Sequence, residues 1–325
     1  MWRGVHRYTV TMTTAVIGAT GQIGSAVVSA LLHTGQRAVA IARSAPRLAG
    51  RERIEGRQVS AYTGDELAPA LKACDRAVVT LGLPYSAKVW LRDWPRLMRE
   101  IARAALDSQI PFVVLDNLYV YGRSHGTPFT ERTPLEPCSA KGRARLQGFK
   151  ELQRARSQGA QITVCRSADF IGPGAEVTVV PWSGLHAVLS ENRHSLRWIG
   201  DPRCQHSYAD PRLVSRGLLA VAASSGLQSH DVVVLPPAEA FSGDDLAQAL
   251  SHRIERQVRL APVGQRMIRA ASLFSRAAHE QVEMMYQVTA DYTVDDALFR
   301  TYQPDFPRLS VDDLVQAWAR SPARG

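Results

Sequence analysis

The first half of the chain alternates short apolar runs with stretches of helical periodicity. The apolar runs predict buried strands of a parallel sheet, at Thr14–Ile17, Arg37–Ala42, Gln58–Tyr62, Ala77–Leu81, Phe112–Leu115 and Ile162–Arg166. Between these runs, apolar residues recur at helical spacing over Gln22–His33, Trp90–Leu106 and Ala140–Ser157. Because Pro95 lies inside the second helix, we expect a kink or two shorter helices there. Strands that alternate with helices in this way predict right-handed βαβ units.

The pattern changes after about Gly172, where prolines and glycines interrupt the alternation. Helical periodicity returns later, and one more apolar run predicts a strand; these segments are Arg212–Ala223, Asp231–Leu235, Gly243–His252, Gly264–Ala278 and Val311–Arg320. Ser242 with Asp245, and Ser310 with Asp313, have the spacing of a capping box.

The sequence therefore predicts an α/β fold, a Rossmann-like doubly wound parallel sheet over residues 14–171. Residues 172–325 are predicted to form a smaller, mainly helical C-terminal substrate lobe, with some elements returning to the sheet. Residues 1–13 are predicted to be a disordered extension.

The segment GATGQIG lies between the first strand and the first helix. Gly18, Gly21 and Gly24 suit a sharp turn, a close approach to a pyrophosphate and tight helix packing, while the helix start supplies amide donors and a positive dipole. We expect this loop, with Thr20, Gln22 and Ile23, to bind a nicotinamide dinucleotide. A tight turn without a ligand is the alternative interpretation.

The end of the second strand bears on the choice of dinucleotide. An NAD site usually offers a carboxylate there for the ribose 2′-hydroxyl, whereas an NADP site offers an arginine. This chain has Arg43 and no acidic residue nearby, so NADP is preferred and NAD stays open. Asp65, after the third strand, is a candidate for the adenine amine, although a loop cap explains it equally well.

Composition narrows the class of protein. The 325 residues include 45% hydrophobic and 21% charged residues, ordinary values for a globular protein. The chain contains no apolar run of about 18 residues, so no membrane span is predicted, and its start does not resemble a secretory signal. The four cysteines form no CxxC pair and the histidines no HExxH motif. We expect reduced thiols, no metal site and a cytoplasmic location.

A net charge of +9 raises the question of nucleic acid as a partner. The basic residues are nearly all arginines and are spread along the chain without an obvious block, so nucleic acid is not expected. A small-molecule substrate is the expected partner, and a homodimer is left open.

Several ordered segments resemble the extended and atypical short-chain dehydrogenase/reductases, the NAD-dependent epimerase/dehydratase superfamily. Besides GATGQIG, they are DRAVVTLGLP (residues 75–84), LYVYG (residues 118–122), CRSADFIGP (residues 165–173) and YAD (residues 208–210). The resemblance implies that Leu81 and Gly82 cover the cofactor. It also implies that a C-terminal segment around residues 279–286 packs on the cofactor domain.

The family's activity normally uses a Ser or Thr beside a YxxxK pair, and no YxxxK occurs in this sequence. Counted from Tyr121 and Gly122, the Ser/Thr position is occupied by Asn117. The tyrosine position falls at or near Lys141 and the lysine position near Arg145. The resemblance thus implies cofactor binding but not the standard proton relay.

Other residues offer candidate chemistry. Asn117 can donate a hydrogen bond to a substrate oxygen, and Lys141 is a candidate for a ribose contact or an acid. Arg145 is a candidate for ribose or phosphate binding. Tyr121 or the neighbouring Tyr119 is a candidate proton donor, and Asp169 a candidate general base. Each of these has a packing, capping or surface role as its alternative.

We therefore expect an NAD(P)-dependent oxidoreductase or epimerase-like enzyme acting on a small oxygenated metabolite. Two alternatives stay open: a non-redox enzyme that retains its cofactor, such as a dehydratase, isomerase or cyclase, and a non-catalytic NADP(H)-sensing regulatory protein. Four aromatic residues are candidates to line the substrate pocket, namely Trp182, His186, Trp198 and His206.

Overall fold

The computed structural model describes residues 12–44, 52–190 and 193–321. Most of the predicted extension, residues 1–11, lies outside these residues. The first strand already begins at Thr13, inside the predicted extension.

Seven parallel strands form the central sheet, in the order β10-β6-β5-β4-β1-β2-β3. The chain enters at β1 and winds outward in both directions, which is the predicted doubly wound topology. The strands are β1 (Thr13–Ile17), β2 (Arg37–Ala42), β3 (Ile54–Gln58), β4 (Arg76–Val79), β5 (Phe112–Asn117), β6 (Ile162–Ser167) and β10 (Val232–Val234). Strand β10 comes from the C-terminal half, so part of that half does return to the sheet.

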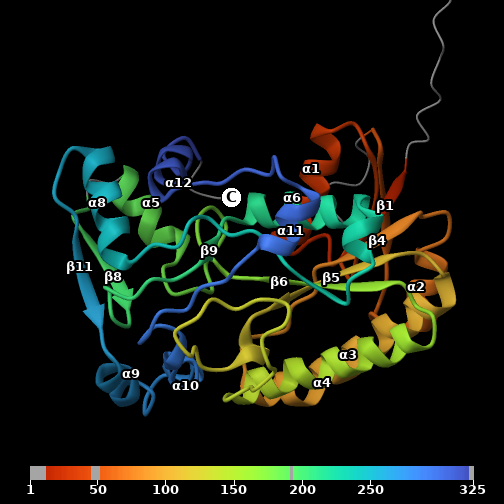
Figure 1. Cartoon of the computed structure of the whole chain (residues 1–325), viewed down its shortest axis with the longest axis horizontal. Helices are drawn as coiled ribbons and strands as arrows, with labels where there is room; N and C mark the ends of the chain where they lie inside the picture. Colours follow the sequence, from red (N-terminus) through yellow and green to blue (C-terminus); the bar gives the residue numbers. More distant parts are fainter. Residues whose placement is uncertain (1–11, 45–51, 191–192, 322–325) are drawn as a thin grey trace, which may run out of the picture.

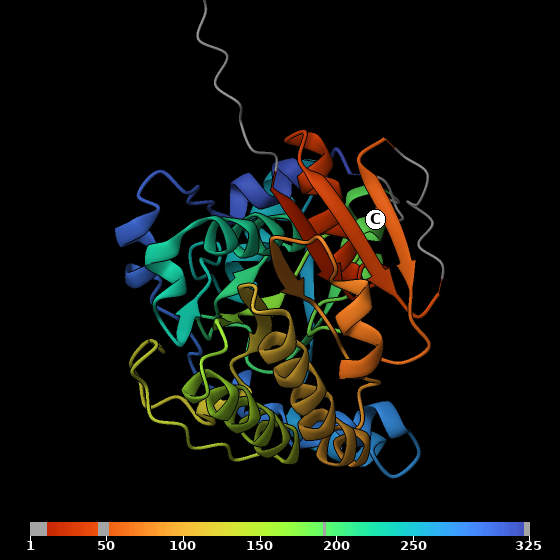
Figure 2. The same ribbon diagram turned by 90° about the vertical axis from the view of Figure 1, so that its right-hand side faces the viewer.

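Helices cover both faces of the sheet (Figures 1 and 2). Alternate strand residues point to opposite faces: Val113 of β5 packs in the cluster with α1 and α6, and Val114 in the cluster with α3 and α4. The covering helices are α1 (Gln22–His33) and α6 (Pro211–Ala223) on one face, and α2 (Gly64–Ala70), α3 (Ala87–Ser108) and α4 (Ala140–Ser157) on the other. Helix α3 runs through Pro95 as one element, so the expectation of two shorter helices is wrong.

The prediction for the third strand was wrong. The strand is Ile54–Gln58 rather than Gln58–Tyr62. It is an edge strand in which only Ile54 is buried, so it lacks the apolar run that marks a central strand. Val59 is buried in the loop that follows, and this loop residue was mistaken for part of the strand.

The C-terminal lobe packs around its own apolar cluster, which includes Trp182, Trp198 and Trp318. Two small parallel sheets, β8 with β11 and β7 with β9, lie outside the central sheet. The elements are β7 (Asp169–Phe170), α5 (Trp182–Ser190), β8 (Ser195–Ile199), β9 (Tyr208–Ala209), α7 (Ser225–Gln228), α8 (Gly243–Ile254), β11 (Arg259–Val263), α9 (Gln265–Ala271), α10 (Arg276–Val282), α11 (Ala297–Tyr302) and α12 (Val311–Trp318), with 3-10 turns η1 (Tyr119–Tyr121) and η2 (Met285–Gln287).

Both predicted capping boxes are present, Ser242 with Asp245 and Ser310 with Asp313. In contrast, the single helix predicted over Gly264–Ala278 is two short helices, α9 and α10. The turn between them exposes Leu273 and Phe274, so the apolar periodicity there does not mark a buried helix face. None of the helices in the described ranges is long and apolar enough to cross a membrane.

Candidate functional site

The turn between β1 and α1 can be built only with glycine. Gly18 has φ +90°, and a Cβ on Gly24 would lie 2.1 Å from the carbonyl oxygen of Gly18. Any side chain at residue 24 would therefore push the helix away from the strand. The close packing brings the start of α1 directly onto the carboxyl end of the sheet, as the glycine pattern predicts.

The first turn of α1 leaves its amide groups free for a ligand. Gly21 is the N-cap and supplies no side-chain hydrogen bond, and no acidic residue lies in the first turn. Unsatisfied N–H groups and the helix dipole favour an anion at this position. The residues present thus fit the diphosphate of a dinucleotide.

A cleft of about 510 Å³ begins at this turn and continues between the two halves of the chain. The turn, the segment after β4, the ends of β5 and β6, and the residues after α10 form its walls. The residues are Gly21–Ile23, Thr80–Tyr85, Trp90, Leu115–Asn117, Tyr119, Arg145, Ser167–Phe170, Val177–Val179, Ile199, Gln281, Met284, Met285, Gln287 and Val288. Of the predicted cofactor contacts, Leu81 and Gly82 line this cleft together with Gly21, Gln22 and Ile23.

Asn117 and Arg145 both line the cleft, but each is already engaged. The Asn117 side-chain oxygen accepts a hydrogen bond from the Tyr119 amide at 3.1 Å, so its amide nitrogen is the group left for a ligand. Arg145 is buried and donates to Asp116 at 2.9 Å. Its guanidinium also lies 3.6 Å from the ring centroid of Trp94. Asp116 and the tryptophan thus hold Arg145 at the side of the cleft.

Two tyrosines, Tyr85 and Tyr119, line the cleft. Burial raises the pKa of Tyr85 and Tyr119 well above the usual range, so both phenols stay protonated and can donate hydrogen bonds. Tyr121 does not line the cleft. Its ring is 1% exposed and stacks on Phe129, so the prediction of Tyr121 as a proton donor is wrong because packing turns it into the core.

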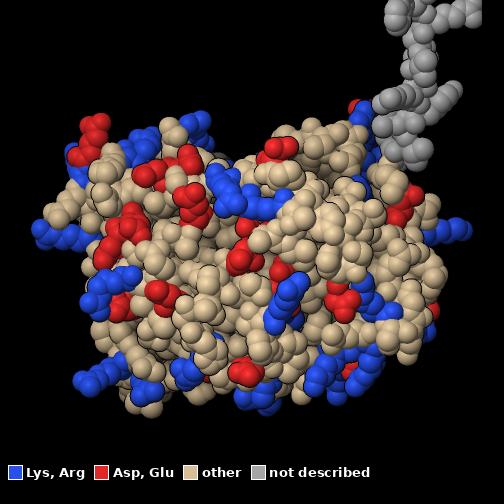
Figure 3. Space-filling view, viewed as in Figure 1, with Lys and Arg blue, Asp and Glu red and all other residues tan. Residues whose placement is uncertain are grey.

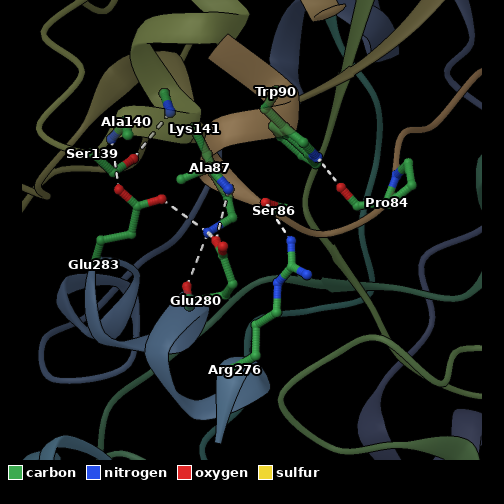
Figure 4. Close-up of polar contacts among 11 residues, drawn as sticks. Pro84, Ser86, Ala87, Trp90, Ser139, Ala140, Lys141, Arg276, Glu280 and Glu283 are labelled. Atoms are coloured by element: carbon green, nitrogen blue, oxygen red, sulfur yellow. Dashed lines mark hydrogen bonds and ion pairs between the residues drawn. The ribbon is translucent and has the colours of Figure 1, made fainter. Parts of the chain in front are cut away.

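Lys141 does not line the cleft either, and its ammonium points to Glu280 and Glu283 (Figure 4). Its side chain is fully buried, and the ammonium lies 2.6 Å from Oε2 of Glu280 and 2.9 Å from Oε1 of Glu283. It also donates to the main-chain carbonyl of Glu280 at 2.9 Å. With its donors occupied by α10, Lys141 cannot reach a ribose or a substrate, so the prediction of Lys141 as a cofactor-binding or catalytic residue is corrected.

The same two carboxylates close the starts of two long helices. Glu280 accepts from the Ala87 amide at the start of α3, and Glu283 accepts from the Ala140 amide at the start of α4, each at 2.7 Å. Anionic groups at helix N-termini are favourable. We call Lys141, Glu280 and Glu283 with these two amides the Lys141 clasp. The clasp fastens α10 over the cofactor half, and the residues that follow α10 form one wall of the cleft.

Asp169 lines the cleft in front of a buried histidine. Nε2 of His206 is 3.2 Å from Oδ2 of Asp169, a close electrostatic contact in which Nε2 makes no directed hydrogen bond among the described residues. Nδ1 of His206 lies 3.3 Å from the Gln287 carbonyl oxygen. None of the four aromatic candidates lines the cleft; three belong to packing around the lobe, and His206 reaches the site only through Asp169.

Two further predicted cofactor contacts, besides Lys141, do not line the cleft. Arg43 is exposed just after β2, with its guanidinium 5.8 Å from the ring centroid of Tyr62. Asp65 is at the start of α2 and pairs with Arg103 of α3 at 2.6 Å. Asp65 thus makes an ion pair between two helices at the surface, a role that neither of the two sequence interpretations included.

The model of the NAD dependent epimerase/dehydratase family matches residues 14–234 of the chain. This chain belongs to that family. It is thus an enzyme of the NAD-dependent epimerase/dehydratase type, as the resemblance implied, and its cofactor is a nicotinamide dinucleotide. None of the curated proteins matches the chain in sequence.

Solved structures of several epimerases and dehydratases are similar to this family member in fold. One is the UDP-glucuronic acid 4-epimerase from Bacillus cereus in complex with UDP-glucuronic acid and NAD, with a TM-score of 0.74 at 17% identity over 95% of this chain and 98% of that chain. Another is the dTDP-glucose 4,6-dehydratase DesIV from Streptomyces venezuelae with NAD bound, with a TM-score of 0.73 at 17% identity over 95% and 96%. The UDP-N-acetylglucosamine 4-epimerase from Bacillus cereus has a TM-score of 0.71 at 14% identity over 97% and 100%.

Sequence reasoning missed the partners that give this family member its distinctive site. Glu280 and Glu283 lie 139 and 142 residues after Lys141 in the chain. One available signal was that two acidic residues stand three apart in the segment around residues 279–286 that was expected to pack on the cofactor domain. For Tyr85, the sequence offered only its position directly after residues 75–84, a segment in which Leu81 and Gly82 were expected to cover the cofactor.

We predict that Lys141→Met lowers the free energy of unfolding by about 3 kcal/mol, because removing one partner of a buried ion pair leaves the other charges uncompensated. Urea denaturation followed by circular dichroism measures the change. Lys150→Met, at an exposed position of the same helix, is the matched control and should change stability by less than about 0.5 kcal/mol. Equal effects of the two variants would contradict the clasp.

The contribution of the Lys141 clasp to the free energy of unfolding depends on pH through the Glu280 carboxyl. Burial acts to raise its pKa, but the hydrogen bonds and charge of Lys141 together with the Ala87 amide outweigh burial, so the pKa is lowered from 4.5. Because the Glu280 carboxyl has a lower pKa in the folded protein than in the unfolded chain, its ionised form stabilises the fold at pH values above the unfolded-chain pKa. This stabilisation is lost as the pH falls through the pKa of the folded protein. We expect Glu280→Gln to be less stable than the wild type at pH 7. The gap should close on acidification below about pH 4.5, and a gap that stays constant down to pH 3 would refute the assignment.

Proposed function

We propose that this protein is an NADP-preferring oxidoreductase for a small, largely apolar carbonyl compound or the corresponding alcohol. The observation that supports the substrate class is the lining of the cleft. Its walls carry tyrosine, tryptophan, phenylalanine, methionine and aliphatic side chains. Arg145 is the one cation among the described residues that line it, and Arg145 is paired with Asp116.

This lining argues against a sugar nucleotide. The UDP-glucuronic acid bound by the Bacillus cereus epimerase carries a diphosphate and a carboxylate, which need several cationic or N–H donors. Beyond the start of α1, which suits the cofactor, the described lining supplies no unpaired cation for such groups. An uncharged substrate with one or two oxygen atoms fits the cleft better.

We assign proton transfer to Asp169, supported by His206. Oδ2 of Asp169 lies 3.2 Å from Nε2 of His206, and Nδ1 of the same ring lies 3.3 Å from the Gln287 carbonyl oxygen. His206 is buried and therefore acts as a positioning residue that fixes the Asp169 carboxyl at the cleft. Asp169 lines the cleft and can exchange a proton with a substrate oxygen.

Tyr85, Tyr119 and the Asn117 amide would orient the substrate oxygen, because each lines the cleft and has donor capacity. The nicotinamide, when bound, supplies or accepts the hydride. Residues 18–24 and the segment Leu81–Gly82 would hold the dinucleotide. The replaced YxxxK pair takes no part, since Lys141 and Arg145 are both in ion pairs.

For the cofactor, Arg43 supports NADP. It follows β2 at the carboxyl end of the sheet, is exposed, and has no ion pair with a described carboxylate. We predict that Arg43→Asp weakens NADPH binding by about 10- to 100-fold, since a charge-assisted hydrogen bond contributes about 1.5–3 kcal/mol, and leaves NADH binding within a few-fold. Fluorescence titration measures both. Arg37→Asp, at the other end of β2, is the control, and a wild type that binds NADH as tightly as NADPH would contradict the preference.

For the chemistry, we predict that Asp169→Asn lowers turnover by about 100- to 10,000-fold, the usual contribution of a general acid or base, without changing the dissociation constant for NADPH. Oxidation of NADPH is followed by absorbance with a panel of aliphatic and aromatic aldehydes and ketones. His206→Gln should reduce kcat less than Asp169→Asn does.

Asp107→Asn, at an exposed position of α3, is the control for loss of a carboxylate. Full activity of Asp169→Asn would exclude Asp169 as the proton donor. Tight NADPH binding with no turnover on any carbonyl would overturn the oxidoreductase assignment and favour a non-redox enzyme or a sensing protein.

A further inference from the structure

The turn between α9 and α10 exposes apolar side chains to an unusual degree. Phe274 is 93% exposed and Leu273 is 78% exposed, the two highest values for large hydrophobic residues in the described chain, and Met267 is 59% exposed. Only Ile268 of helix α9 is buried. The turn thus holds apolar surface that the fold itself does not use, and adjacent exposed residues of this kind mark interaction sites.

Basic residues surround these apolar side chains. From residue 256 to residue 279 the chain contains no aspartate or glutamate and five arginines, Arg256, Arg259, Arg266, Arg269 and Arg276. No ion pair joins them to a described carboxylate, and Arg276 donates a hydrogen bond to the Ser86 hydroxyl at 3.4 Å. The whole chain has a net charge of +9, and residues 256–279 alone carry a charge of +5.

The segment also lies at an edge of the molecule. Figure 1 draws α9 at the lower left corner, and in the same view Figure 3 shows basic and uncharged atoms at that corner. We call residues 264–279 the basic tip. Its most exposed apolar residues are at the turn, and Arg266, Arg269 and Arg276 are on the helices beside it.

We propose that the basic tip docks on an anionic membrane surface. Leu273 and Phe274 would enter the interface between headgroups and acyl chains, while the arginines bind lipid phosphates and carboxylates. Exposed aromatic and aliphatic residues next to arginines suit this boundary, which is apolar on one side and negatively charged on the other.

The positive charge and the apolar side chains of the basic tip argue against two other partners, a second copy of this chain and nucleic acid. Two copies of the tip placed face to face would bring six arginines together without an acidic residue of the tip to compensate them, which like-charge repulsion disfavours. Nucleic acid would satisfy the arginines, but it would leave Leu273 and Met267 without a favourable contact. A lipid surface satisfies both kinds of side chain.

The docking also places the cleft near the lipid. Helix α10 continues from the tip directly into Gln281, Met284 and Met285, which line the cleft. An apolar carbonyl compound would partition into the membrane beside this wall. The docking itself does not depend on the proposed chemistry, and its test needs neither cofactor nor turnover.

The test is co-sedimentation of the full chain with large vesicles in about 0.1 M salt. We expect binding to vesicles of phosphatidylcholine with 30% phosphatidylserine, ~10-fold or more weaker binding to phosphatidylcholine alone, and loss of binding as salt is raised. Binding that is equal for the two compositions, or absent from both, would overturn the proposal.

Two variants separate the apolar and the charged contributions. Arg266→Glu with Arg269→Glu should weaken binding to the anionic vesicles by about 100-fold or more, and Leu273→Asp with Phe274→Asp by about 10-fold or more. Arg96→Glu, at an exposed position of α3, is the matched charge control and should bind within about 3-fold of the wild type. Thermal unfolding shows whether each variant is folded.

Three other results would overturn the proposal. The first is unchanged vesicle binding by folded variants of the tip. The second is a concentration-dependent dimer that Phe274→Asp abolishes, which would assign the tip to a second copy. The third is tight binding to a DNA duplex without binding to vesicles.

Discussion

The buried ammonium group of Lys141 determines how α10 is attached to α3 and α4 beside the cleft. A buried, unpaired lysine would cost several kcal/mol, and Lys141 is fully buried. Glu280 and Glu283 compensate its charge from α10, and the same carboxylates accept the first amides of α3 and α4. Three segments far apart in the chain are thereby held together, and the wall that follows α10 has a defined position above the cleft.

The clasp also changes which side of the cleft can carry chemistry. Where the family usually has a tyrosine and a lysine facing the nicotinamide, this chain has Lys141 in the clasp and Arg145 between Asp116 and the tryptophans of α3. Both charges are compensated within the protein by carboxylates. The proposed proton path therefore uses Asp169, backed by His206, together with the phenols and the amide around residues 85–119.

The inner and outer surfaces of the C-terminal segment have different characters. Toward the cleft it presents glutamine and methionine side chains, and toward the solvent it presents arginines and apolar residues. One continuous stretch from α9 to η2 thus connects a basic, apolar surface with an apolar cavity. The same stretch therefore links the two proposals, a carbonyl or alcohol substrate in the cleft and an anionic lipid surface at the basic tip.

The sequence alone determined the features that depend on neighbouring residues: the central strands, the glycine turn before α1, the two capping boxes and the absence of YxxxK. Periodicity, helix capping and the steric demand for glycine all act within about ten residues, so they can be read from the chain. Tertiary structure decided the rest. Edge strand β3 has only one buried residue, so its position depended on pairing with β2, and the exposed turn at Phe274 divided a helix that looked continuous. The directions of Lys141, Tyr121 and Asp169 depended on partners as far as 142 residues away, because the free energy of burying a charge or a ring is set by what surrounds it in space and not by what precedes it in the chain.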